Sequence, residues 1–381
     1  MSELKLYYAT NRNHIGKDRW HPSAYGAKFS ADGIENLRFG VLSVTADDAR
    51  LRRFLTAQLG TCGTGDGESL AGYLATCARK ATIVAYEERI DPAIADAAQQ
   101  DAVYGSSAMF ADLKADMLAS TDVMLYIHGF NVSWFEAVGG ALAAQCMLRN
   151  APQSEPTQQL NVVLFTWPSD GMALPLVSYK SDRSEAAGSG AAIGRGFLKV
   201  RDFLAALRDR AKTGEPLCGQ DIHLLCHSMG NYLLQHALKR VVQFTPGTAL
   251  PRLFEHIFLC APDVDDTVLE PAQPLVRVHE IARTVTIYFN RHDAAMVVSD
   301  YTKGNPERLG GTGAARPALL HNKIHQVDCT PIVSGVVQHS YYLAGNISHD
   351  IRASMDGWTQ NDPRRKRLRD ANLNNVWTML A

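Results

Sequence analysis

The stretch Cys226-His227-Ser228-Met229-Gly230 decides which fold to expect for this chain. An apolar-rich run of five residues precedes it, typical of a buried strand, and a helical pattern follows it. A serine at such a strand-to-helix turn has a strained backbone, and its hydroxyl points out above the sheet end, where a substrate can reach it. The usual pattern is G-x-S-x-G: Gly230 fits it, and Cys226 is a small residue in place of the first glycine. The alternative is that Ser228 is only the N-cap of the helix.

The composition excludes several classes of partner. The chain has 381 residues and 46% hydrophobic residues, enough for a large buried core. Lys plus Arg (38) nearly equals Asp plus Glu (39), so the net charge gives no reason to expect nucleic-acid binding. No apolar run reaches the roughly eighteen residues of a membrane helix, and the N-terminus has no signal-peptide pattern. We therefore expect no transmembrane segment and a cytoplasmic location.

The seven cysteines indicate neither disulfides nor zinc. Their odd number and scattered spacing argue against a disulfide framework and agree with a reducing cytoplasm. There is no C-x-x-C pair and no other convincing ligand spacing, so we expect no metal and no cofactor. Nothing in the sequence fixes the oligomeric state.

Strands alternate with helices along the chain, which predicts a mostly parallel sheet with helices on both faces. Together with the serine turn, this order is that of the α/β-hydrolase fold. We expect an N-terminal extension of strands and helices packed on the same sheet over residues 1–120, a catalytic core over 121–350, and a polar, basic tail over 351–381. Besides the strand and helix beside Ser228, strands are expected at residues 4–9, 39–44, 82–86, 123–127, 162–166, 256–260, 284–289 and 324–327, the last of the sheet, and helices at 47–59, 106–120, 134–149 and 184–209.

Three segments lack a regular pattern. Residues 168–190 are rich in Gly, Ser and charge, and residues 296–322 contain several glycines and two prolines. Each is expected to be a loop, either beside the substrate or on the surface. The basic run at residues 363–369 is interpreted as a solvated helix face, with an acidic partner or a membrane as the alternative.

A serine hydroxyl needs a base to take its proton, and in this fold the acid and then the histidine follow the serine along the chain. Two carboxylates after Ser228 directly follow expected strands. Asp293 follows the penultimate expected strand, which is the commonest acid position of the fold. Asp263 follows the strand before it, a rarer position. We therefore expect Asp293 to be the acid, with Asp263 as the alternative.

The base should lie on a loop after the last expected strand. His321 precedes that strand and His325 lies within it, so neither is suitably placed. His339 lies about a dozen residues beyond the strand, on a segment that can return over the site. His349 is farther along the chain. We therefore expect His339 to be the base.

An oxyanion hole needs two backbone N–H groups. One should come from Met229, the residue after the nucleophile, and the other from the loop after the strand at 123–127. In that loop Gly129 allows close approach, and the N–H of Phe130 is the best candidate donor. His128 and His227 are interpreted as structural rather than as bases.

Substrate-binding residues are expected in or beside the irregular segment after the strand at 162–166. Trp167 and Tyr179 are the candidates, together with apolar neighbours on the same segment. Such residues line an acyl pocket or pack the loop onto the core. The neighbours are Met172, Leu174, Leu176 and Val177.

These motifs, in this order, resemble a bacterial α/β-hydrolase family of unknown function that is loosely labelled an esterase/lipase superfamily. The resemblance covers roughly residues 1–345 and implies the fold and a triad of Ser228, Asp293 and His339, but no substrate. Cys226 departs from the Gly or Ala usual at its position. The matching pieces are Tyr8-Ala9-Thr10-Asn11-Arg12, His128-Gly129-Phe130-Asn131, Phe165-Thr166-Trp167-Pro168-Ser169, Tyr179 with Asp182, Cys226-His227-Ser228-Met229-Gly230-Asn231, Ala261-Pro262-Asp263, Asn290-Arg291-His292-Asp293 and His339-Ser340-Tyr341-Tyr342.

The function expected from these residues is hydrolysis of carboxylic esters on small molecules, through an acyl-serine intermediate. An amidase or a thioesterase would use the same triad. A catalytically inactive interaction module would instead be expected to lack one member of the triad, and here every position is filled.

Overall fold

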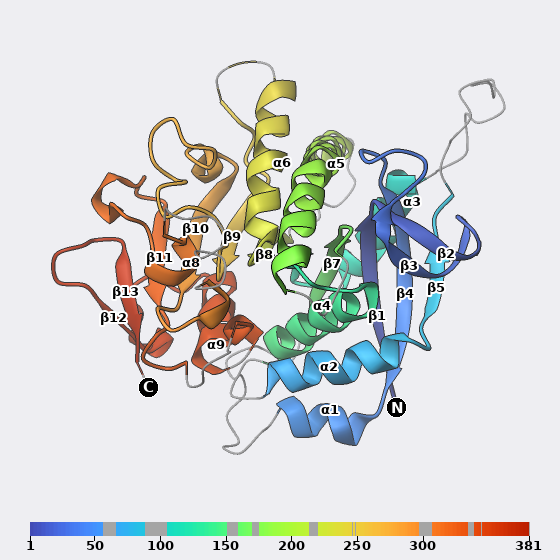
Figure 1. Ribbon diagram of the computed structural model, residues 1–381, viewed down its shortest axis with the longest axis horizontal. Helices are drawn as coiled ribbons and strands as arrows, with labels where there is room; N and C mark the ends of the chain where they lie inside the picture. Colours follow the sequence, from blue (N-terminus) through green and yellow to red (C-terminus); the bar gives the residue numbers. More distant parts are fainter. Residues whose placement is uncertain are drawn as a thin grey trace.

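The computed structural model describes residues 1–55, 66–87, 105–150, 159–169, 175–212, 220–245, 247, 249–296, 307–333, 339–343 and 345–380. In these residues an eleven-stranded sheet runs through the molecule in the order β12-β13-β11-β10-β9-β8-β6-β7-β1-β4-β5 (Figure 1). Its strands are β1 (Ser2–Thr10), β4 (Arg38–Ala46), β5 (Thr82–Ala85), β6 (Asp122–Ile127), β7 (Leu160–Thr166), β8 (Asp221–His227), β9 (Phe254–Cys260), β10 (Ala282–Phe289), β11 (Ile324–Asp328), β12 (Arg367–Arg369) and β13 (Val376–Met379).

The strands from β1 to β13 in this order are all parallel, and the antiparallel pairs are β1–β4, β4–β5 and β12–β13. Parallel strands are covered on both faces and therefore read as continuous apolar runs. This is why β6 and β8 were recognisable in the sequence. A separate hairpin of β2 (Arg12–Asp18) and β3 (His21–Phe29) follows β1.

The sheet divides the hydrophobic core into two layers, each covered by helices. One face of the sheet packs against α3 (Gly105–Leu118), α5 (Pro175–Ala211) and α6 (Gly230–Phe244). The other face packs against α1 (Asp48–Leu55), α2 (Gly67–Ala78), α4 (Trp134–Arg149) and α9 (Gly345–Met355). A four-residue helix, α8 (Leu309–Thr312), and 3₁₀ turns at Val278–Glu280, Pro317–Leu319, Tyr341–Leu343 and Pro363–Arg365 complete the described elements. None of the described helices has both the length and the apolar character required to cross a bilayer.

Helix α5 corrects the expectation of a loop over residues 168–190, because it begins at Pro175. Proline is favoured in the first turn of a helix. Gly190, one of the glycines that suggested a loop, and Gly194 farther along the helix allow α5 to pack closely on α6. A Cβ on Gly190 would lie 2.2 Å from the Cβ of His236, and one on Gly194 would lie 2.6 Å from the Cβ of Arg240. Composition alone cannot separate such close helix packing from a loop.

The C-terminal segment also differs from its expectation. The sheet does not end at β11, since β13 and β12 extend it, and the basic run is not a solvated helix face. Arg365 and Arg367 are buried and paired with the buried Asp350 of α9, at 2.7 and 3.0 Å. Tyr288 donates a further hydrogen bond to Asp350 at 2.7 Å. Buried charges require such pairing, so these arginines hold the C-terminal strands to the core.

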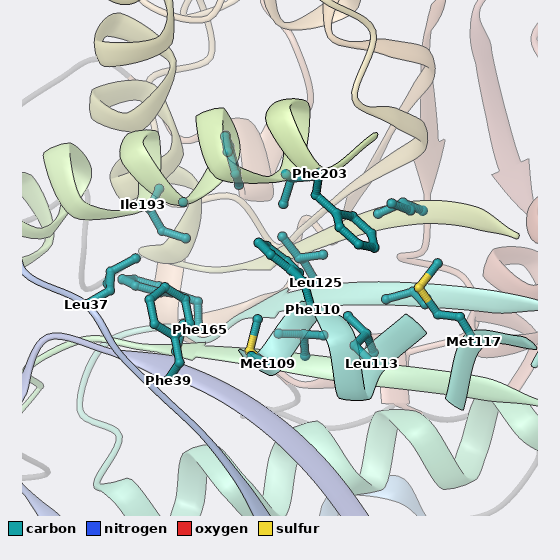
Figure 2. Close-up of a pocket in the computed structure, with 17 residues that line it drawn as sticks. Leu37, Phe39, Met109, Phe110, Leu113, Met117, Leu125, Phe165, Ile193 and Phe203 are labelled. Carbon is teal, nitrogen blue, oxygen red and sulfur yellow. The ribbon is translucent and has the colours of Figure 1, made fainter. Parts of the chain in front are cut away.

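An apolar cavity of about 50 Å³ lies between α3, α5 and the sheet. Figure 2 shows its labelled side chains, among them Phe110 and Phe203, whose rings stack with centroids 4.8 Å apart. Gly196 of α5 also lines it, and a Cβ there would meet only Leu37, at 3.5 Å. The cavity therefore leaves room for one extra methyl group without a clash.

Candidate active site

Ser228 lies between β8 and α6 with a left-handed backbone, φ +52°. Such a conformation costs energy for a residue other than glycine and persists only where surrounding contacts hold it. Its N–H donates to the carbonyl of Cys260 at 2.9 Å. Gly230 has no room for a side chain, because a Cβ would lie 2.7 Å from the His128 carbonyl oxygen. The turn therefore has the strained geometry expected of a nucleophile elbow, at the carboxyl end of the central strand β8.

His339 and Asp293 meet beside this turn although they come from different loops. His339 Nδ1 lies 2.7 Å from Asp293 Oδ2. Asp293 is 1% exposed, and its other carboxylate oxygen accepts a hydrogen bond from the N–H of Ala295 at 3.0 Å. A carboxylate can only accept, so Nδ1 carries the proton in the neutral imidazole and Nε2 keeps a lone pair. That is the tautomer a general base requires.

Two atoms of the site have no hydrogen-bond partner among the described residues: Ser228 Oγ and His339 Nε2. They are the donor and the acceptor that a nucleophile and its base would join. His227 connects the two residues. Its ring packs on that of His339 with centroids 4.6 Å apart, and its Nε2–H donates to the His339 carbonyl at 3.1 Å. Burial, and after it the neighbouring His339, lowers the pKa of His227 well below its usual value, which keeps this ring neutral.

The alternative acid, Asp263, has other partners. Its carboxylate accepts a hydrogen bond from the Tyr179 hydroxyl at 2.9 Å and lies 3.6 Å from Arg308 Nε. Its backbone N–H donates to the carbonyl of Ser228 at 3.2 Å. Asp263 thus contacts the Ser228 turn through its backbone N–H, whereas the carboxylate next to His339 is that of Asp293.

The loop after β6 approaches the serine closely. A Cβ on Gly129 would lie 2.8 Å from Ser228 Cβ and 3.3 Å from Ser228 Oγ, so only glycine fits there. Phe130 follows it, and its ring meets that of Tyr179 edge-on at 5.5 Å. Met229 is the N-cap of α6, so the positive end of the helix dipole lies next to Ser228. Both expected N–H donors thus lie on segments adjoining Ser228.

His128 holds this loop as a neutral side chain. Its Nδ1–H donates to the Gly129 carbonyl at 2.7 Å, and its Nε2 accepts from the Thr166 hydroxyl at 2.9 Å. Burial, and secondly the charge of Arg12, lowers the pKa of His128 to about 3. It therefore carries no charge at neutral pH and is not placed to act as the base.

Trp167 and Tyr179, the expected substrate-binding residues, are both buried. Trp167 stacks on His128 with ring centroids 5.3 Å apart, and its indole N–H donates to the His128 carbonyl at 3.2 Å. A substrate-binding role for the pair stays a prediction. Of their apolar neighbours, Met172 and Leu174 lie outside the described residues.

Sequence reasoning gave no roles to Arg12, Asp182 and Ser169, which surround the Gly129 loop. Their only signal in the sequence was that they lie in the stretches that resemble the hydrolase family.

In the part of the chain that the structure describes, no group of three or more His, Cys, Asp or Glu side chains is arranged to hold a metal ion.

The parallel sheet and the serine turn between β8 and α6 define the class of the protein, an α/β hydrolase. A comparison with protein-family models is more specific. Residues 106–351 match a family described as "Alpha/beta hydrolase of unknown function (DUF900)". The match covers more than half of the chain, which therefore belongs to this family, and membership indicates hydrolase activity. A comparison with curated proteins finds no match.

Proposed function

We propose that the protein is a serine hydrolase that cleaves carboxylic esters of small molecules through an acyl-enzyme intermediate on Ser228. The observation that carries the proposal is the meeting of three independent segments: the strained Ser228 turn, the Asp293–His339 pair at 2.7 Å, and the Gly129 loop with no room for a side chain beside the serine. A structural serine would require none of these.

In the proposed mechanism, His339 Nε2 takes the Ser228 proton as Oγ attacks the ester carbonyl carbon. The carbonyl oxygen becomes an oxyanion, which accepts hydrogen bonds from the N–H groups of Phe130 and Met229. Asp293 keeps the imidazole in the reactive tautomer and stabilises its charged form. When the tetrahedral intermediate collapses, His339 returns the proton to the departing alcohol. Water then attacks the acyl group in the same way and releases the acid.

The test is hydrolysis of a panel of short- to long-chain acyl esters, with the matching amides and thioesters as separate arms. We expect ester turnover by the wild-type protein and a loss of about 10⁴- to 10⁶-fold in kcat for Ser228→Ala. Turnover of amides or thioesters but not esters would replace the ester proposal while keeping the triad. A folded Ser228→Ala protein with near wild-type turnover would contradict the nucleophile.

A matched pair of variants tests the acid. In Asp293→Asn a single amide oxygen replaces two carboxylate oxygens, one of which accepts from the N–H of Ala295 and the other from His339 Nδ1. With the amide oxygen on the Ala295 N–H, its NH2 group faces His339 Nδ1 and favours the tautomer protonated on Nε2, so we expect a loss of about 10⁴-fold in kcat. Asp263→Asn changes a carboxylate that is also 1% exposed but is bonded to Tyr179 instead. It should lose far less. The reverse order of losses would exchange the two roles.

A further inference from the structure

Two buried, oppositely charged side chains hold the segment that carries the proposed oxyanion donor. Arg12 is the first residue of β2, and Asp182 lies in the first part of α5; they are 1% and 0% exposed. They contact the backbone of residues 131–132, immediately after Phe130. Neither belongs to the proposed triad, and sequence reasoning gave neither residue a role.

Asp182 holds the loop through backbone N–H groups. Its Oδ2 accepts a hydrogen bond from the N–H of Asn131 at 2.7 Å and another from the Ser169 hydroxyl at 2.5 Å. The Ser169 oxygen in turn accepts from the N–H of Val132 at 3.0 Å. One carboxylate oxygen therefore fixes two successive N–H groups, the second through Ser169.

Arg12 holds the opposite polar groups of the same segment. Its Nη2 donates to the Val132 carbonyl at 2.8 Å, and its Nη1 donates to the Ser169 carbonyl at 3.1 Å. Its Nε donates to the Thr166 hydroxyl at 2.8 Å, and that hydroxyl donates to His128. One rigid guanidinium thus joins the start of β2, the end of β7 and the loop. A lysine has a single ammonium and cannot reproduce this fork.

The loop needs such support because it belongs to neither a strand nor a helix. Residues 128–133 lie between β6 and α4, and Asn131 has a left-handed backbone, φ +57°. No ladder of backbone hydrogen bonds sets the direction of the Phe130 N–H. A donor to an oxyanion must be correct to within about half an ångström, which requires rigid supporting contacts.

The two buried charges also carry an energetic cost. Burial lowers the pKa of Arg12 to about 9, although nearby carboxylates, first of them Asp182, raise it. Arg12 therefore remains charged at neutral pH inside the protein. Buried opposite charges of this kind add little net stability compared with apolar side chains of the same volume. The value of these two lies instead in the fixed geometry that they impose on the loop.

We propose that Arg12 and Asp182 are positioning residues that orient the Phe130 N–H toward the oxyanion. This inference rests on the proposed serine-hydrolase function. It also assigns Arg12, the first residue of β2, to the catalytic unit, although Arg12 precedes the residues 106–351 that match the family.

The test compares Asp182→Ala, Arg12→Lys and Ser169→Ala with Asp202→Ala, the same change as the first on an exposed carboxylate of the same helix. We measure kcat and KM on the best ester, inhibition by an alkylboronic acid, and thermal unfolding. The boronate adds to Ser228 and puts an oxygen into the oxyanion hole. Complete loss of one oxyanion donor costs about 10²- to 10³-fold in kcat. A displaced donor should cost about 10- to 100-fold.

We expect kcat to fall by this factor in the three variants, the boronate Ki to rise by the same factor, and KM to stay within about twofold. Asp182→Asn keeps an oxygen that can accept both hydrogen bonds, so it should retain more activity than Asp182→Ala. Ser169→Ala removes a single hydroxyl and no charge. It therefore tests the inference if replacement of Asp182 or Arg12 lowers the fraction of folded protein.

Three outcomes overturn the inference: wild-type kcat in folded variants, a loss that merely follows the folded fraction, or an unchanged boronate Ki. Failure of the proposed function looks different, because wild-type protein would then show neither ester turnover nor Ser228-dependent inhibition by the boronate.

Discussion

Replacement of Gly129 by alanine tests whether the loop after β6 serves an oxyanion at Ser228. The added Cβ would lie 2.8 Å from Ser228 Cβ and 3.3 Å from Ser228 Oγ. Carbon atoms in contact prefer about 3.5–4.0 Å, so the loop or the serine must move by about 0.7 Å or more. A hydrogen bond of about 2.9 Å from the loop would lengthen to about 3.6 Å and would no longer be one.

Loss of one oxyanion donor costs about 10²- to 10³-fold in kcat, or about 3–4 kcal/mol of transition-state stabilisation. We expect this loss in Gly129→Ala, measured by steady-state hydrolysis of the preferred ester. Thermal unfolding shows that the variant is folded. Gly72→Ala is the matched control, because a Cβ on that α2 residue meets nothing within 4 Å. It should keep wild-type kcat. Folded Gly129→Ala with kcat within about threefold of wild type would refute the reasoning.

Four further predictions concern stability and metal dependence. Gly196→Ala should raise the free energy of unfolding by about 1 kcal/mol, because the added Cβ enters the cavity and alanine favours helix. Gly194→Ala in the same helix should lower it, because its Cβ would lie 2.6 Å from the Cβ of Arg240. Equal effects of the two variants in denaturant unfolding would contradict the prediction. Asp350→Asn leaves two buried arginines short of negative charge and should cost about 3–5 kcal/mol, with earlier proteolysis of the C-terminal strands; an unchanged unfolding midpoint would oppose it. Burial lowers the pKa of His256 to about 3 and that of His325 to about 4, below the unfolded value of about 6.5. The free energy of unfolding should therefore be highest above pH 6.5 and should fall from there toward pH 4, by up to about 1.4 kcal/mol per pH unit for each histidine. A urea unfolding midpoint that stays constant over this range would contradict the prediction. Activity should be unchanged in EDTA, and its loss with recovery in zinc or manganese would favour a metallohydrolase.

Local sequence patterns were sufficient where local chemistry decides the structure. The helix expected at 134–149 agrees with α4, which begins at a capping box formed by Ser133 and Glu136. The buried strands of the parallel sheet were recognisable as apolar runs. The order of elements after Ser228 also led to the Asp293–His339 pair, because carboxyl ends of parallel strands meet at one edge.

Tertiary partners were not visible in the sequence. The basic run resembled a solvated face because nothing local shows that Arg365 and Arg367 meet Asp350 across the fold. The first part of α5 resembled a loop because it contains glycines, and nothing local in the sequence shows that Gly190 packs against His236 of α6. The pairing of Asp263 with Tyr179, which leaves the histidine to Asp293, is likewise a long-range contact.

The most direct test of the central claim is the mass of the protein after reaction with a fluorophosphonate, followed by peptide mapping. If Ser228 is the activated nucleophile, its Oγ forms a bond to phosphorus, the P–F bond breaks and fluoride leaves, and His339 takes the hydroxyl proton. The account predicts a single adduct on the peptide containing Ser228, none on Ser228→Ala, and much slower labelling of Asp293→Asn. An adduct at another residue, or equal labelling of folded Ser228→Ala, would contradict it.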